Sequence, residues 1–117
     1  MEGEDIKVIK TRQFGKRIMS LYKFLSNKKI DVISRQILRS GTSIGANVSE
    51  SVFSESRIDF RHKIAIALKE TNETLYWLDL LNHGDYITNE QYNSLRDDCS
   101  EILKILQAII KSSKSND

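Results

Sequence analysis

The side chains that could do chemistry in this sequence are few and widely spaced. The two histidines, His62 and His83, fall in one predicted helix, 21 residues apart. A helix rises about 1.5 Å per residue, so about 30 Å would separate them, too far for one chain to bind a metal ion with both. Asp59 and His62 have the i, i+3 spacing of di-iron helix bundles. Such a site needs two Glu-x-x-His motifs and two further carboxylates, and the sequence has no second pair. We therefore expect no metal ion and no cofactor.

Nucleophilic and phosphate-binding chemistry is also poorly supported. The single cysteine, Cys99, lies on the apolar stripe of a predicted helix. A small buried side chain is the ordinary role there, and no base is placed beside it. Gly41 and Gly45 are four residues apart, but no preceding strand and no following Lys-Ser/Thr completes a phosphate-binding loop. We expect no catalytic residue and no enzymatic activity.

A run of small residues interrupts the second predicted helix. Glycine costs about 1 kcal/mol relative to alanine inside a helix, so two glycines one turn apart indicate that the missing side chains are used. In one interpretation, Gly41, Gly45 and Ala46 let a neighbouring helix, or a second subunit, approach closely. In the other, Ser43, Asn47 and exposed backbone amides contact a ligand or a partner. The spacing is compatible with both.

Basic residues are concentrated at the start of the chain. Residues 1–29 hold eight Lys or Arg and three Asp or Glu, a net charge of +5 in a chain whose total is +2. Arg12, Lys16 and Lys23 share one side of the first predicted helix, away from its apolar stripe. They could contact RNA or DNA weakly, with strong salt sensitivity and no sequence preference. The plainer interpretation is a solvated helix face.

A second pair of cations, Arg35 and Arg39, lies one turn apart on the second predicted helix. The pair could bind phosphate or form ion pairs with Glu70 and Glu73. Because carboxylates are plentiful on the third predicted helix, we expect ion pairs between subunits.

Four long helices must position these residues. The chain has no proline and only five glycines, and apolar residues recur every three or four positions, which is typical of amphipathic helices. Thr88 and Gln91 form a capping box, and Ser56 with Asp59 resembles one, so both pairs mark helix starts. We expect an all-α fold of one domain, residues 1–117, forming an antiparallel up-down-up-down four-helix bundle. The expected helices are residues 5–26, 30–52, 56–83 and 88–112.

Apolar residues exceed what one such core needs. On the third predicted helix, a second set of apolar residues widens the arc beyond a single stripe: Ile58, Ala65, Tyr76, Trp77 and Leu80. The excess consists of Tyr76 and Trp77 on this helix and Leu103 and Ile110 on the fourth. Exposed apolar surface of this kind usually marks self-association. No apolar run approaches the roughly 18–20 residues that span a bilayer, and the acidic N-terminus lacks the features of a signal peptide. We therefore expect a cytoplasmic homo-oligomer with no membrane partner.

Three stretches together resemble a known family. They are Arg35–Val48, which contains Arg-Ser-Gly-Thr-Ser-Ile-Gly-Ala-Asn, then Asp59–Glu70, and Glu73–Leu81 with its Tyr-Trp-Leu-Asp-Leu-Leu sequence. The chain is similar to the bacterial four helix bundle protein family, also called the 23S ribosomal RNA intervening-sequence protein family. The resemblance implies an antiparallel bundle that often assembles as a ring-like homopentamer, and no established enzymatic activity. Some members are encoded within insertions in 23S ribosomal RNA genes. A related group assists diversity-generating retroelements, where a basic pentamer engages reverse transcriptase and nucleic acid.

Three classes of function follow from these observations. The first is a non-enzymatic homo-oligomeric scaffold or accessory protein that touches RNA or DNA through the first helix. The second is a protein-interaction module, with a partner encoded nearby and no nucleic-acid role. The third, an enzyme or metal carrier, has the least support because no constellation of catalytic or ligating residues is present.

Overall fold

Four helices account for nearly all of the part of the chain that the computed structural model describes, residues 5–115. Within this range there is no β-strand. The expected boundaries are close to the observed ones, except that the last helix continues three residues beyond position 112. The helices are α1 (Ile6–Ser26), α2 (Val32–Ser51), α3 (Arg57–His83) and α4 (Asn89–Ser115).

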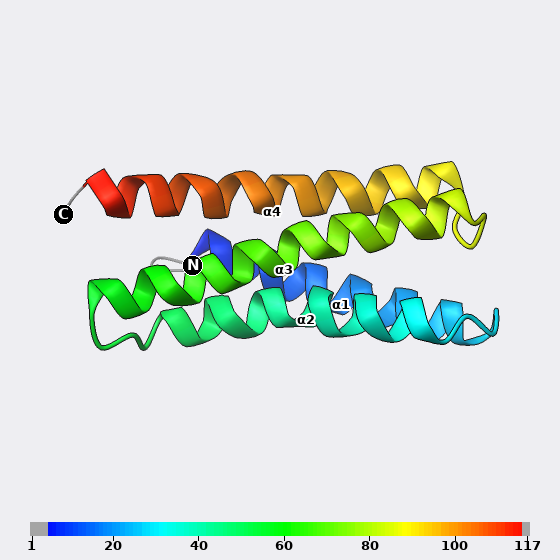
Figure 1. The fold of residues 1–117 in the computed structure, drawn as a ribbon, viewed down its shortest axis with the longest axis horizontal. Coiled ribbons are helices and arrows are strands. Elements are labelled where there is room, and N and C mark those ends of the chain that lie inside the picture. The colour runs from blue at the N-terminus through cyan, green and yellow to red at the C-terminus, as the bar shows by residue number, and fades with distance from the viewer. Residues whose placement is uncertain (1–4, 116–117) are drawn as a thin grey trace.

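The helices pack side by side along one axis. The molecule is 47 Å long and 25 × 24 Å across, and short connections bring each helix back beside the preceding one (Figure 1). The contacts are most extensive between α2 and α3 and least extensive between α1 and α4. The bundle therefore has one loosely closed side, the seam between its first and last helices.

Side-chain caps begin α3 and α4 where the sequence predicts. Ser56 Oγ accepts a hydrogen bond of 3.0 Å from the Asp59 amide. Thr88 Oγ1 accepts one of 3.1 Å from the Gln91 amide, while Gln91 Oε1 accepts one of 2.8 Å from the Thr88 amide. This reciprocal pair is the capping box expected from the sequence. Each cap satisfies backbone amides that have no partner inside the helix.

The predicted apolar stripes meet in one core that runs the length of the bundle. Phe14, Ile18 and Leu25 of α1 are 1% exposed or less, and each of the other helices contributes residues to the same cluster. Hydroxyl groups are buried among them, and Thr74 Oγ1 donates a 2.8 Å hydrogen bond to Ser40 Oγ. No buried side-chain nitrogen or oxygen of the described residues lacks a hydrogen-bond partner. None of the described helices combines the length and the apolarity needed to cross a bilayer.

Candidate nucleic-acid interface

The small-residue run on α2 brings α1 close to α2 in the same chain. A Cβ atom added to Gly41 would lie 2.7 Å from Cγ1 of Ile18, and one added to Gly45 would lie 3.2 Å from the backbone oxygen of Thr11. Side chains at these two positions would push the helices apart. The close-approach interpretation therefore applies to α1 of the same chain. Ala46 is exposed.

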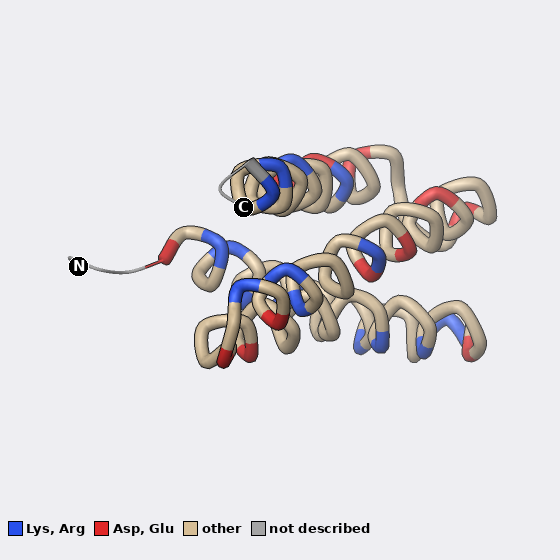
Figure 2. Tube along the Cα trace, turned by 60° about the vertical axis from the view of Figure 1, so that its left-hand side comes forward, with Lys and Arg blue, Asp and Glu red and all other residues tan. Residues whose placement is uncertain are grey.

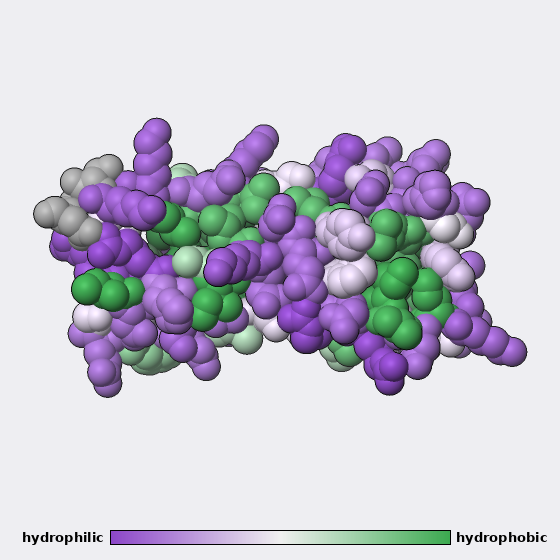
Figure 3. All heavy atoms as spheres, in the orientation of Figure 1, coloured by the Kyte–Doolittle hydropathy of each residue, from purple (hydrophilic) through white to green (hydrophobic). Residues whose placement is uncertain are grey.

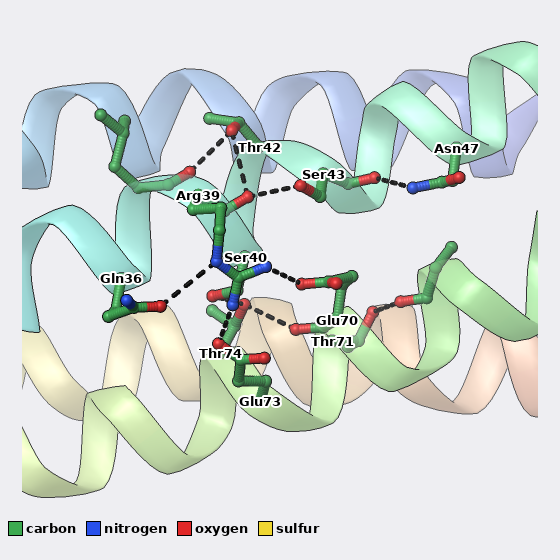
Figure 4. Close-up of polar contacts among 12 residues, drawn as sticks. Gln36, Arg39, Ser40, Thr42, Ser43, Asn47, Glu70, Thr71, Glu73 and Thr74 are labelled. Carbon is green, nitrogen blue, oxygen red and sulfur yellow. Dashed lines mark hydrogen bonds and ion pairs between the residues drawn. The ribbon is translucent and has the colours of Figure 1, made fainter.

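The polar side chains of the run bond within α2 (Figure 4). Ser43 Oγ donates to the Arg39 carbonyl at 2.6 Å, and Asn47 Nδ2 donates to the Ser43 carbonyl at 2.9 Å. Such bonds to the preceding turn are common for short polar side chains inside helices. In this arrangement Ser43 and Asn47 support their own helix, so the ligand-contact interpretation gains no support from their geometry.

On its outer side, the α1–α2 contact forms an open groove of about 260 Å³. We call it the α1–α2 groove. Small residues line the space between its two helices, which leaves the groove open. At Gly15, no atom lies within 4 Å of the position that a Cβ would occupy. Two of the sequence-predicted nucleic-acid contacts stand on its α1 rim. The groove is lined by residues that include Arg12, Gly15 and Lys16 of α1 and Gly45, Ala46 and Ser49 of α2.

The cations of α1 differ in their surroundings, and Lys7 at its start pairs with Asp5. On the side facing α4, Lys10 pairs with Glu101 and Arg17 pairs with Asp98, each at 2.7 Å. Another group, Arg12, Lys16 and Lys23, is exposed. Among the described residues, no carboxylate forms an ion pair with these three.

The structure keeps the three predicted contacts on one side of α1 with their charges unneutralised. Positions 12, 16 and 23 fall within about 40° of one another around a helix of 3.6 residues per turn. Basic residues also occur on the other three helices (Figure 2). What distinguishes the α1 group is therefore its alignment beside a groove, not the presence of positive charge alone.

Arg39 forms its ion pairs inside the chain, which corrects the expectation of bonds between subunits. Arg39 Nη1 lies 3.0 Å from Glu70 Oε2, and the same guanidinium also pairs with Glu73 (Figure 4). The sequence did not indicate that Trp77 joins this cluster, where its Nε1 donates to Glu73 Oε2 at 2.8 Å. The indole hydrogen bond and then the guanidinium hold the pKa of the Glu73 carboxyl below its ordinary value, against the opposing effect of burial. Arg35 pairs with Asp31 on its own helix at 3.2 Å.

Two aromatic rings mark the outer face of α3. Tyr76 is 56% exposed and packs edge-to-face on Trp77, with 5.1 Å between ring centroids. Trp77 is only partly exposed, because its other side packs on the core. Leu103 and Ile110 of α4 are also half-buried. Figure 3 shows apolar side chains at the surface between α3 and α4. The sequence predicts self-association through residues of these two helices.

Residues 4–108 match the family model described as 23S rRNA-intervening sequence protein. The chain belongs to this family. A crystal structure from Bacteroides thetaiotaomicron VPI-5482, of a protein with unknown function from the S23 ribosomal protein family, is similar over most of its length. The two chains are 56% identical, and their structures superpose with a TM-score of 0.89. The match covers 90% of this chain and 98% of that one. No curated protein matches the sequence.

The reactive side chains of this family member lie apart from one another. Cys99 is fully buried, and burial, with a smaller effect from Asp98, raises the pKa of its thiol to about 12. His62 and His83 are exposed near opposite ends of α3. Residues 5–115 contain no group of three His, Cys, Asp or Glu side chains placed to hold a metal ion.

Apolar exposure also appears where the sequence did not indicate it. Phe53, in the connection between α2 and α3, is 85% exposed, and its neighbour Val52 is 54% exposed. Ile58, which the pattern places in the widened apolar arc of α3, is 72% exposed. Position 58 lies in the first turn of α3, where no other helix covers it. Helical periodicity identifies a face but not how far along the helix its neighbours extend.

Proposed function

We propose that this protein is a non-enzymatic, homo-oligomeric helical bundle with a scaffold or accessory role. It binds nucleic acid weakly, and without sequence preference, through α1. The observation that carries the proposal is the row formed by Arg12, Lys16 and Lys23, exposed and unpaired among the described residues. The description of the family refers to an intervening sequence of 23S rRNA.

The chemistry of this row fits phosphate better than bases. Lys and Arg side chains neutralise phosphates and release condensed counterions, so affinity falls steeply as salt rises. Base reading needs side chains inserted into a groove of the nucleic acid with donors and acceptors at fixed positions. The residues near the row that line the α1–α2 groove are small or apolar, as are Gly15, Met19 and Ala46. The expected binding is therefore sequence-independent.

Self-association is the second part of the proposal. Tyr76 and Trp77 on α3, with the half-buried apolar residues of α4, form the surface that we assign to contacts between subunits. The resemblance to pentameric relatives favours five subunits with an antiparallel up-down-up-down topology in each. A ring would present five copies of the basic row and multiply its attraction for phosphates. We place this assembly in the cytoplasm.

A competing function, protein interaction without nucleic acid, is favoured by the connection between α2 and α3. Phe53 and Val52 are exposed there, and aromatic residues are enriched at protein interfaces. The partner would be a protein encoded nearby. The two functions differ in what they require of α1, because only nucleic-acid binding depends on its unpaired cations.

Fluorescence anisotropy with labelled nucleic acid across a salt series tests the proposal. The variant R12Q/K16Q/K23Q should lose most binding and lower the slope of log K against log salt by about one unit per cation removed. The control K69Q/K104Q/K114Q removes the same charge from exposed positions on α3 and α4, and it should retain most of the affinity. Salt-independent binding, or equal losses in the two variants, would contradict a site on α1.

A further inference from the structure

The α1–α2 groove and the basic row beside it indicate which form of nucleic acid this surface fits. We propose that it binds the phosphate backbone of a double helix in preference to a single strand. This inference rests on the proposed nucleic-acid binding and adds the class of ligand. It is carried by the spacing of the cations, the surroundings of the exposed aromatic rings and the shape of the groove.

The cations form a straight and rigid row. Arg12 and Lys16 are one turn apart, about 6 Å along the axis, and Lys23 lies about 10 Å further. All three belong to one uninterrupted helix. A double helix presents phosphates at fixed positions and carries about one charge per 1.7 Å of its axis. Because a double helix is stiff, it loses little conformational freedom when it aligns with a rigid row of cations. A flexible single strand would lose conformational freedom in the same alignment.

The surface has few aromatic rings on which the bases of a single strand could stack. Proteins that prefer single strands stack bases on exposed aromatic rings. The ring of Phe24 faces the α4 side, where it lines a hollow with Leu95 and Gln91, and the Lys28 ammonium lies 4.9 Å from its centroid. Tyr76 belongs to α3, a different helix from the two that form the groove.

Phe53, which is 85% exposed, follows Ser49 of the groove by four residues in the sequence. Backbone hydrogen bonds fix the connection that carries it, from the Phe53 amide to the Glu50 carbonyl at 3.0 Å and from the Ser54 amide to the Ser51 carbonyl at 3.2 Å. Glu50 and Glu55 flank this ring in the sequence. Glu50 is paired with Lys63 at 3.1 Å, and Phe53 is separated in the chain from the basic row of α1.

The shape of the groove suits a bulky backbone. At Gly15 an added Cβ would meet nothing within 4 Å, and Ala46 is exposed on the opposite wall. The absence of side chains lets a phosphate backbone descend between the rims, as glycine permits at other ligand sites. The Ser49 hydroxyl forms no hydrogen bond with any described residue, so it is available to donate to a phosphate oxygen.

The test compares a 20-base-pair DNA duplex with each of its separated strands, by anisotropy at one low salt concentration. We expect the full chain to bind the duplex at least fivefold more tightly than either strand. Ala46→Leu fills the groove without changing charge and should weaken duplex binding at least threefold. The control Ala108→Leu, at an exposed position of α4, should not. Circular dichroism checks that both variants keep the helical content of the unmodified chain.

The outcomes separate this inference from the proposal on which it depends. Equal or tighter binding of a single strand overturns the duplex preference but leaves nucleic-acid binding in place. A selective loss of single-strand binding in Phe53→Ala, with equal wild-type affinities, would identify a stacking site instead. Unchanged duplex binding in Ala46→Leu shows that the groove is not the contact. No binding to duplex or strand overturns both, and it would leave protein interaction as the function.

Discussion

At the scale of single residues, Gly15 and Gly41 have opposite roles although both lie within helices. Gly41 is buried against Ile18 of α1, whereas Gly15 lines the open groove. Both carry the same intrinsic penalty relative to alanine in a helix. Only at Gly41 does close packing compensate for it. The difference depends on what lies opposite each Cα atom.

Alanine substitutions should separate these two roles. Gly41→Ala places a Cβ 2.7 Å from a fully buried isoleucine, so we expect a net loss of about 1–2 kcal/mol after the gain in helix propensity. Gly15→Ala meets no neighbour and should stabilise the fold by about 0.5–1 kcal/mol. Urea unfolding followed by circular dichroism measures both. If Gly41→Ala were as stable as Gly15→Ala, the close approach of α1 and α2 would not depend on this glycine.

Cys99 leads to a prediction about reactivity and pH. Because burial raises the pKa of its thiol to about 12, above the ordinary 9.0, the native protein should not react with a thiol reagent at pH 8, and urea should expose a single reactive thiol. The folded state prefers the neutral thiol, so its contribution to stability is present below pH 9 and is lost as the pH rises towards 12. Rapid labelling under native conditions would mean that Cys99 is accessible.

At the scale of elements, an ion-pair cluster joins α2 to α3 beside the buried hydroxyls of Ser40 and Thr74. Arg39 pairs with Glu70 and Glu73, close to where Thr74 donates to Ser40. These groups connect the two helices with the most extensive contact in the bundle. The cluster is partly solvent-exposed, so its ion pairs are screened and its main effect is to fix the relative position of the helices.

Trp77 should report the protonation of Glu73. The pKa of this carboxyl is lowered from the ordinary 4.5 by the indole hydrogen bond and by Arg39. Its stabilising effect is therefore present above pH 4.5 and is lost as the pH falls through the lower, folded-state value. We expect a change in tryptophan fluorescence below pH 4.5 in the native chain. Glu73→Gln keeps an acceptor oxygen but does not titrate, so its fluorescence should be flat over that range; an identical acid transition would assign the signal to another group.

The sequence predicted the positions of the helices better than it predicted which helices pack against each other. The cap pairs beginning at Ser56 and Thr88 place two helix starts, because hydroxyl caps act on amides three residues away and need no tertiary information. The identity of the partner of Gly41 could not be obtained in this way, since periodicity gives the buried face but not the helix that covers it. For the same reason, the sequence led us to expect the ion-pair partners of Arg39 in another subunit, although they lie in α3 of the same chain. The alignment of Arg12, Lys16 and Lys23 was predictable, but the groove beside them depends on the packing of α1 on α2.

At the scale of the whole molecule, the two long sides of α1 are closed in different ways. Towards α2 the contact is close, with backbone approaching backbone at Gly45. Towards α4 the contact is the least extensive in the bundle, and the Lys10–Glu101 and Arg17–Asp98 ion pairs cross it. Exposed ion pairs contribute little to stability. The fold therefore depends on the contacts of α2 and α3, and the outer face of α3 is left for other contacts.

Self-association through α3 should depend on Tyr76. Light scattering at micromolar concentration should give a mass several times the 13.5 kDa of one chain. Tyr76→Glu puts a charge at the centre of the proposed interface, where an unpaired buried charge is strongly unfavourable, and should reduce the mass towards that of a monomer. Val32→Glu is the matched control, because Val32 is 67% exposed at the start of α2. A monomeric native chain would refute the assembly, and a loss of mass in both variants would place the interface elsewhere than on α3.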